Sequence, residues 1–274
     1  MEIQDFITKY LSPATSLLES AFHIYEGKYP KPIFVVKNSK LKWRYENPQR
    51  ENACILKSVA VISGLNSINH LLSGGCYQEI QIVLRTIHES LDDIHFLLIG
   101  YNEKELSEIQ KRYLKEYFKE EFINSDIPYQ GTTEKEFIPR KKILAEIGRD
   151  LGNYSNPTDV IKLNNINADI NSGYIHAAYS QMMDLYGGEP PFSKFYLSGC
   201  LNTPRIISSF KSIASVLNQS LAITGLICIK FNCIEIGIEL MDKRKSFEKS
   251  DPELFPTGNI DSNKYLLNIK KGKV

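Results

Sequence analysis

One segment of the chain combines a helical apolar pattern with ionisable residues that could do chemistry. Between residues 76 and 100, apolar side chains recur at three- and four-residue steps, which predicts an amphipathic helix with one buried face. At about 100° per residue, five polar residues fall in one band roughly 80° wide: Gln81, Arg85, His88, Asp92 and His95. Apolar Ile82, Phe96 and Ile99 lie within or beyond that band. We therefore expect a half-buried polar line, whose charges must be paired because unpaired buried charge is costly.

Arg85 lies in the middle of this predicted helix, and two interpretations of it remain open. In the structural interpretation, the guanidinium pairs with Glu89, one turn further on, or with Asp92. In the functional interpretation, it is a clamp for phosphate or carboxylate, since guanidinium binds such anions through two parallel hydrogen bonds.

His88, Asp92 and His95 follow at spacings of four and three residues and so share one face. Such spacing serves two chemistries. Asp92-x-x-His95 resembles half of a carboxylate metal site in a helical bundle, but the chain has no second Glu-x-x-His, and we assign no metal and no cofactor. Alternatively, a histidine oriented by a carboxylate is a general acid or base near neutral pH. A core histidine satisfied by Asp92 is the simplest state for His88.

A second group of candidates occupies the segment NSGYIHAAYSQMMDLYGG. Ser172 and His176 share a helical face at a spacing of four residues, and Tyr174 and Tyr179 flank them. A serine hydrolase is not indicated, because the chain lacks the Gly-x-Ser-x-Gly turn that exposes such a nucleophile.

Together these residues resemble a family. Arg85-x-x-x-Glu89 followed by Ser172-x-Tyr174-Ile175-His176 resembles a group of uncharacterised bacterial helical proteins, which are distantly similar to the HEPN superfamily. That superfamily consists of helical bundles and includes RNA-cleaving toxins and phage-defence effectors. The resemblance covers roughly residues 50–190. HEPN nucleases carry an Arg shortly before the His on the same helix, whereas residues 169–172 here are Asp, Ile, Asn and Ser, so Arg85 would have to replace it from a neighbouring helix.

The order of apolar segments predicts an all-α fold, a multi-helix bundle with a four-helix core and peripheral helices and loops. We expect residues 1–50 to form an N-terminal helix, interrupted near Pro13, and an extended lead-in; residues 51–246 to form the bundle; and residues 247–274 to form a peripheral tail. The four core helices are predicted at 51–73, 76–100, 158–186 and 204–246, with amphipathic helices at 103–124 and 137–151. Lys40–Tyr45 is a basic and aromatic cluster around Trp43, which indicates a docking strand or a surface that stacks a base.

Bulk composition narrows the class of protein. With 274 residues and a net charge of +1, no global field attracts the chain to nucleic acid or a membrane. The five cysteines include no Cys-x-x-Cys pair, which indicates reduced, buried thiols in a cytoplasmic protein. The uncharged stretches Ser58–Gln78 and Ser212–Ile229 contain several polar residues, so we expect buried helices and no membrane partner.

Three functions follow as alternatives. The first is a HEPN-like, metal-independent ribonuclease of phage defence or a toxin–antitoxin pair, with RNA as partner. Its catalytic residues would be Arg85, His88, Glu89, Asp92 and His176, and its substrate-binding residues Ser172, Tyr174, Tyr179 and His95. The second is a non-catalytic interaction or scaffold protein with a structural ion-pair seam, which binds a protein partner or a second copy of itself. The third is a carboxylate and histidine metal-binding bundle.

Overall fold

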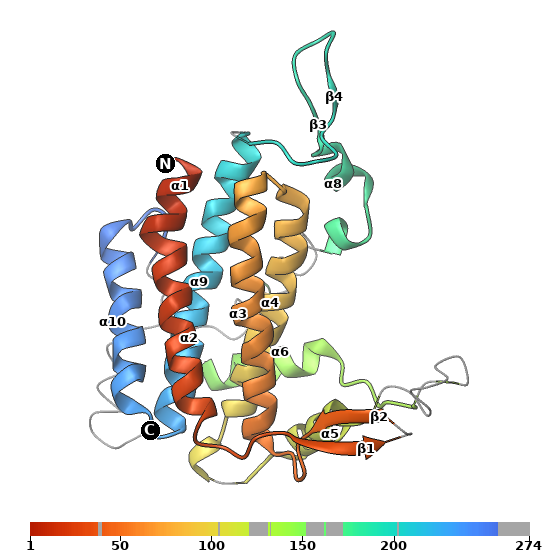
Figure 1. Ribbon diagram of the computed structural model, residues 1–274, viewed down its shortest axis with the longest axis vertical. Coiled ribbons are helices and arrows are strands. Elements are labelled where there is room, and N and C mark those ends of the chain that lie inside the picture. Colours follow the sequence, from red (N-terminus) through yellow and green to blue (C-terminus); the bar gives the residue numbers. More distant parts are fainter. Residues whose placement is uncertain are drawn as a thin grey trace.

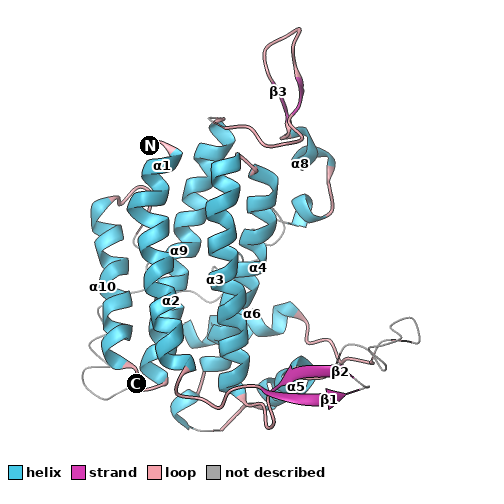
Figure 2. Cartoon of the chain, viewed as in Figure 1, coloured by secondary structure: helices cyan, strands magenta, loops and turns pink. Residues whose placement is uncertain are grey.

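The computed structural model contains a bundle of long helices, which confirms the predicted all-α class (Figures 1 and 2). It describes residues 1–37, 40–103, 105–120, 131, 133–151, 162, 172–201 and 203–256. Five long helices form the bundle: α2 (Ser12–Glu26), α3 (Arg50–Gly74), α4 (Tyr77–Leu98), α9 (Pro204–Lys230) and α10 (Ile234–Ser250). The N-terminal segment thus packs within the bundle, since α2 lies against α3, α9 and α10.

The predicted interruption near Pro13 takes the form of a widened turn and not a break. A short helix α1 (Ile3–Phe6) and a π-helical turn η1 (Ile7–Leu11) run directly into α2. Proline has no backbone N–H to donate to the preceding turn, so the helix widens by one residue before it. Thr15 Oγ1 also donates back to the carbonyls of Leu11 and Ser12, at 3.1 and 3.0 Å.

Helices α3 and α4, at the places predicted for the first two core helices, form an antiparallel hairpin. Gly75 ends α3 with a φ of 68°, in the left-handed region that glycine tolerates best. A side chain there would also collide with the backbone of Cys200, since an added Cβ would lie 2.6 Å from its carbonyl carbon. The turn therefore fixes both the direction of α4 and the position of the chain that leads into α9.

The helix predicted at 204–246 is two helices, so that prediction is wrong. Residues 231–233 separate α9 from α10, and Asn232 adopts a φ of 59°. Asparagine tolerates this left-handed conformation better than most residues, and it lets the chain reverse. Gly225 and Gly237 then allow close contact: an added Cβ on Gly237 would lie 3.1 Å from the Gly225 carbonyl oxygen.

The prediction of a core helix at 158–186 fails in the part that the structure describes. Residues 152–161 and 163–171 lie outside the described residues. Residues 172–175 form one helical turn, Ala177 has a φ of 49°, and α8 (Tyr179–Met183) is short. Two brief strands, β3 (Tyr186–Gly187) and β4 (Lys194–Phe195), follow as a hairpin that extends beyond the bundle (Figure 1).

Smaller elements surround the other end of the bundle. Strands β1 (Ile33–Lys37) and β2 (Lys40–Arg44) form an antiparallel hairpin. The helix predicted at 103–124 is shorter: η2 (Tyr101–Glu103) is followed by α5 (Glu108–Tyr117), which begins where Ser107 and Gln110 form a capping box. Helix α6 (Arg140–Asp150) begins after Pro139 and packs against α4.

The hydrophobic core reaches into the predicted tail. Phe247, Leu254 and Phe255 are buried, and the Phe255 ring lies 4.9 Å from that of Tyr10. Residues 257–274 lie outside the described residues. By length and composition alone, two described helices, α3 and α9, are apolar enough to cross a membrane, with 39% and 67% of their most apolar windows buried in the bundle.

Candidate functional site: a charged cavity beside helix α4

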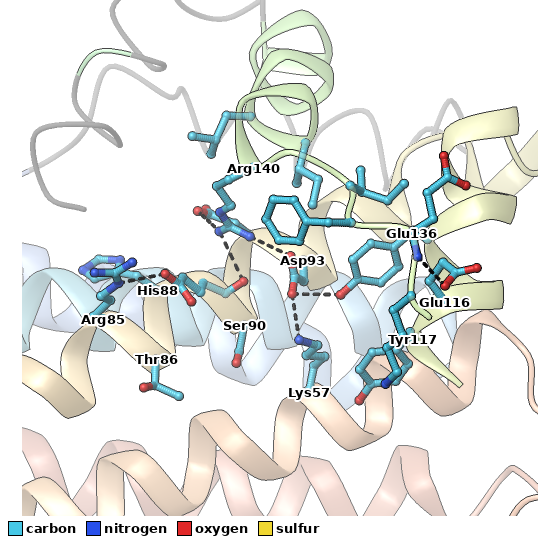
Figure 3. Close-up of a pocket in the computed structure, with 18 residues that line it drawn as sticks. Lys57, Arg85, Thr86, His88, Ser90, Asp93, Glu116, Tyr117, Glu136 and Arg140 are labelled. Atoms are coloured by element: carbon cyan, nitrogen blue, oxygen red, sulfur yellow. Dashed lines mark hydrogen bonds and ion pairs between the residues drawn. The ribbon is translucent and has the colours of Figure 1, made fainter. Parts of the chain in front are cut away.

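A cavity of about 760 Å³ lies where α4 meets α3, α5 and α6, and it contains most of the polar line of α4 (Figure 3). Helix α4 contributes Arg85, His88, Glu89, Asp92 and Asp93 to its wall. Lys57 comes from α3, Tyr113 from α5 and Arg140 from the first turn of α6, and apolar Phe137, Ile138, Ile143 and Leu144 cover one side. The cavity is therefore a mixed polar and apolar space built by four elements.

Two adjacent buried aspartates form its centre. Arg140 Nη1 donates to Asp93 Oδ1 at 2.6 Å, and Arg140 Nη2 donates to Asp92 Oδ2 at 2.5 Å. Asp93 Oδ2 also accepts from Lys57 Nζ at 2.7 Å and from the Tyr113 hydroxyl at 2.8 Å. We call these five residues the ion-pair centre. Its two carboxylates face two cations, so its formal charge is balanced.

The electrostatics of the ion-pair centre follow from its burial. Burial raises the pKa of the Asp92 carboxyl, against the opposing pull of Arg140 and His88. Burial acts to lower the pKa of Arg140, but its carboxylate partners outweigh that effect and raise it, so the guanidinium stays charged. The pKa of Tyr113 is raised by burial and by the charge of Asp93, so its hydroxyl stays protonated and donates.

His88 lies in the same cavity in a neutral state. Its Nδ1 lies 3.1 Å from Gln219 Oε1 of α9. An amide oxygen only accepts, so Nδ1 carries the proton and Nε2 keeps its lone pair. Burial lowers the pKa of this imidazole, and the charge of Asp92 and the hydrogen bond that His88 donates to Gln219 only partly counter it.

The guanidinium of Arg85 has one nitrogen with a hydrogen-bond acceptor and one buried nitrogen without an acceptor among the described residues. Its Nε donates to Glu89 Oε1 at 2.9 Å, as the structural interpretation of the sequence predicts. Its Nη1 is buried and has no hydrogen-bond partner among the described residues. Because a buried donor without a partner is costly, this atom on the wall of the cavity calls for an acceptor.

The structure separates the other predicted site residues from this cavity. His95 Nε2 lies 3.2 Å from Asp150 Oδ2 at the end of α6, and His95 is not among the residues that line the cavity. The Tyr174 hydroxyl donates to Asp184 Oδ2 at 2.8 Å and lies 3.1 Å from the Tyr77 hydroxyl, at the first residue of α4. Eight residues separate Tyr77 from Arg85, roughly 12 Å along the helix axis.

His176, Ser172 and Tyr179 belong to that same end of the molecule. His176 and Tyr179 are exposed, and Ser172 is half-buried with its carbonyl bound to the amide of His176 at 3.0 Å. None of the three lines the cavity that contains Arg85. The described contacts therefore do not bring Arg85 and His176 together, which is what a composite site would require.

Sequence reasoning missed the residues that complete the ion-pair centre. Asp93 is adjacent to Asp92 but is rotated by about 100° around the helix axis, so it lies outside the predicted polar line. Arg140 and Lys57 lie in ordinary amphipathic patterns. Two consecutive aspartates between the apolar residues Leu91 and Ile94 were the available signal, because a pair of buried carboxylates requires cations from elsewhere.

Comparison with known proteins returns no match for this chain, whether to a family model, a curated protein or a solved structure. Among the described residues, no group of three or more histidine, cysteine, aspartate or glutamate side chains could hold a metal ion. Its function must therefore be argued from the cavity itself.

Proposed function

We propose that the protein is a non-catalytic helical interaction protein, and that the ion-pair centre is structural. The observation that carries this proposal is the pairing of both buried carboxylates: Arg140 bridges Asp92 and Asp93, and Lys57 and Tyr113 complete the shell of Asp93. A carboxylate that already accepts from three fixed donors, as Asp93 does, is poorly suited to take a proton from a substrate, and Asp92 is already bound to a cation.

The same contacts explain what a structural centre does here. They join α4 to α3, α5 and α6, in addition to apolar packing and to other polar contacts such as the hydrogen bond from Gln110 Nε2 to the Phe96 carbonyl. Sliding α4 by one residue would rotate both aspartates by about 100° and leave Arg140 without a partner. Buried ion pairs contribute little net stability, but they penalise such alternatives strongly, which selects one register.

An interaction protein of this kind binds a protein partner or a second copy of itself. Its test compares the wild type with Arg140→Met and with the compensated pair Arg140→Met and Asp92→Leu, in which Asp93 keeps Lys57 as its cation. We expect no cleavage of single-stranded RNA by any of them, and the same mass by light scattering for the wild type and the compensated pair. RNA cleavage by the wild type, or a compensated pair that folds but differs in mass from the wild type, would refute the proposal.

A second candidate is metal-independent RNA cleavage of the HEPN-like type, with a smaller catalytic set than the sequence suggests. Arg85 Nη1, buried without a partner, and the lone pair on His88 Nε2 favour it, because both residues line the same cavity. Arg85 would stabilise charge on a phosphate, His88 would accept the proton of a 2′-hydroxyl, and Glu89 would hold Arg85 in place.

The chain offers a matched control for this candidate. Arg85→Ala and His88→Gln should each lower RNA cleavage by about 100-fold or more, as the loss of a general base or a charge-stabilising group does. His176→Ala, outside the cavity, should leave cleavage unchanged. Equal cleavage by the wild type and all three variants removes this candidate.

A further inference from the structure

The β1–β2 hairpin has one face made entirely of exposed apolar side chains. In its register Phe34 pairs with Trp43 and Val36 with Leu41, so these four side chains lie on the same side of the two strands. Their exposed fractions are 55%, 57%, 74% and 68%. We call these four residues the apolar face of the hairpin.

The opposite face anchors the hairpin to the bundle. Arg44 donates from Nε to Glu120 Oε1 at 2.6 Å and from Nη2 to Glu120 Oε2 at 3.0 Å, just beyond α5. Val35 and Lys42, on that same face, are half-buried. Because side chains alternate between the two faces of a strand, this anchor places the apolar face on the side opposite to Arg44. A two-stranded hairpin is marginally stable alone, so an exposed apolar face of this kind needs an explanation beyond folding.

Cations outnumber carboxylates in the segment that forms the hairpin. Residues 27–45 contain six cations and no carboxylate, namely Lys28, Lys31, Lys37, Lys40, Lys42 and Arg44. Among the described contacts, Glu26 pairs with Lys31 and Glu120 pairs with Arg44. Counted along the sequence, residues 26–46 contain six cations and two carboxylates, in a chain whose total charge is +1.

From this combination we propose that the apolar face of the hairpin docks on an anionic lipid surface. Lysines attract the segment to negative headgroups, and tryptophan, phenylalanine and aliphatic side chains then enter the boundary between headgroups and acyl chains. The chain as a whole carries no such field, which is why composition alone predicts no membrane partner. The proposal concerns adhesion to a surface, not a helix that spans it, and it does not depend on the function of the cavity.

Lipid explains the apolar face better than RNA does. The rings of Phe34 and Trp43 lie against each other, with centroids 3.5 Å apart, so each ring already has one side covered. The two most exposed members, Val36 and Leu41, have no aromatic face on which a base could stack, but they do partition into hydrocarbon. RNA binding would account for the cations and one ring surface, and would leave the aliphatic pair without a role.

Trp43 makes the test direct, because it is the single tryptophan of the chain. The full-length protein is mixed with vesicles of phosphatidylglycerol and phosphatidylcholine, with vesicles of phosphatidylcholine alone, and with polyuridylate. We expect the emission of Trp43 to shift to the blue, and the protein to sediment, only with the anionic vesicles. High salt should weaken binding, since the attraction is screened.

Two pairs of substitutions distinguish binding through the apolar face of the hairpin from non-specific hydrophobic adsorption. Val36→Ser with Leu41→Ser retains the fluorescent reporter and should lower partitioning to anionic vesicles roughly tenfold or more. The control pair, Phe192→Ser with Leu197→Ser, removes side chains that are 81% and 89% exposed near the β3–β4 hairpin and should leave partitioning unchanged. Circular dichroism checks that both remain folded. The proposal is overturned if anionic vesicles cause no blue shift, if the control pair weakens binding equally, or if polyuridylate alone changes the emission of Trp43.

Discussion

Replacing Arg140 with methionine tests how much the protein depends on the ion-pair centre. Methionine retains most of the apolar stem but removes the two hydrogen bonds to Asp92 and Asp93 and a third, at 3.3 Å, to the carbonyl of Glu89. Asp93 would keep Lys57 and Tyr113, whereas Asp92 would lose its cation. The variant therefore leaves one buried carboxylate without a partner.

The expected cost follows from burial. The side chains of Asp92 and Asp93 are 11% and 9% exposed, whereas that of Arg140 is 30% exposed. Removing one partner of a buried pair costs about 3–5 kcal/mol, and the partial exposure of Arg140 places this case near about 3 kcal/mol. For a chain of this size, such a loss lowers the melting temperature by roughly 6–12 °C.

The assay is urea unfolding followed by far-ultraviolet circular dichroism, which reports on the helices. The matched control is Arg149→Met on the same helix α6, where the guanidinium is 67% exposed and pairs with Glu146. An exposed pair of this kind contributes at most about 0.5 kcal/mol. The two variants remove the same charge from the same helix, so their difference isolates burial.

The compensated pair completes the design. Arg140→Met together with Asp92→Leu removes the stranded carboxylate as well, and it should recover at least about 2 kcal/mol of the loss, because apolar replacements of buried ion pairs are often neutral. If Arg140→Met costs no more than Arg149→Met, the ion-pair centre does not hold the helices together. If the compensated pair is as unstable as Arg140→Met alone, the cost arises from lost packing and not from buried charge.

Two further predictions concern His88 in the cavity and the close contact between α9 and α10. Burial holds the pKa of His88 below its ordinary value, so as the pH falls below about 6.5 the unfolded chain takes up a proton that the folded chain does not. The free energy of unfolding should therefore fall as the pH drops from about 7 to the lowered pKa of the folded state. Urea unfolding at several pH values should show a weaker dependence of this free energy on pH for His88→Gln than for the wild type. The same pH dependence in both proteins would contradict this prediction. Gly237→Val should lower the free energy of unfolding by about 2–3 kcal/mol, because the new side chain would collide with the Gly225 carbonyl and with Ile229. The control Glu239→Val, on the exposed side of α10, should lower it by only about 0.5 kcal/mol. Similar losses for both variants would show that α9 and α10 do not need this close contact.

Part of the site could be predicted because it is local. Arg85 and Glu89 are four residues apart on one helix, and that spacing alone brings a guanidinium to a carboxylate. The half-buried character of His88 followed in the same way from its apolar neighbours. What the helix pattern did not reveal was the partner of His88, since Gln219 lies 131 residues further along the chain.

The errors in the fold prediction have related causes. The break between α9 and α10 depends on Asn232, whose left-handed conformation produces no gap in the apolar pattern on either side. The apolar and aromatic residues after Ser172 looked like a core helix, yet the chain turns at Ala177 and leaves several of those side chains exposed. Periodicity reports which face of a helix is apolar, but it does not report what covers that face.

The amino-acid sequence by itself determined the helical class, the α3–α4 hairpin and the polar line on α4, because periodicity, caps and glycine turns act over a few residues. Only the tertiary structure decided which of the polar residues share a cavity. Arg140 reaches Asp93 across 47 residues of chain, and the described contacts bring Arg85 together with His88 and not with His176. Such contacts depend on the path of the whole chain, because the interaction between two charges is set by their distance and burial and not by their separation in the sequence.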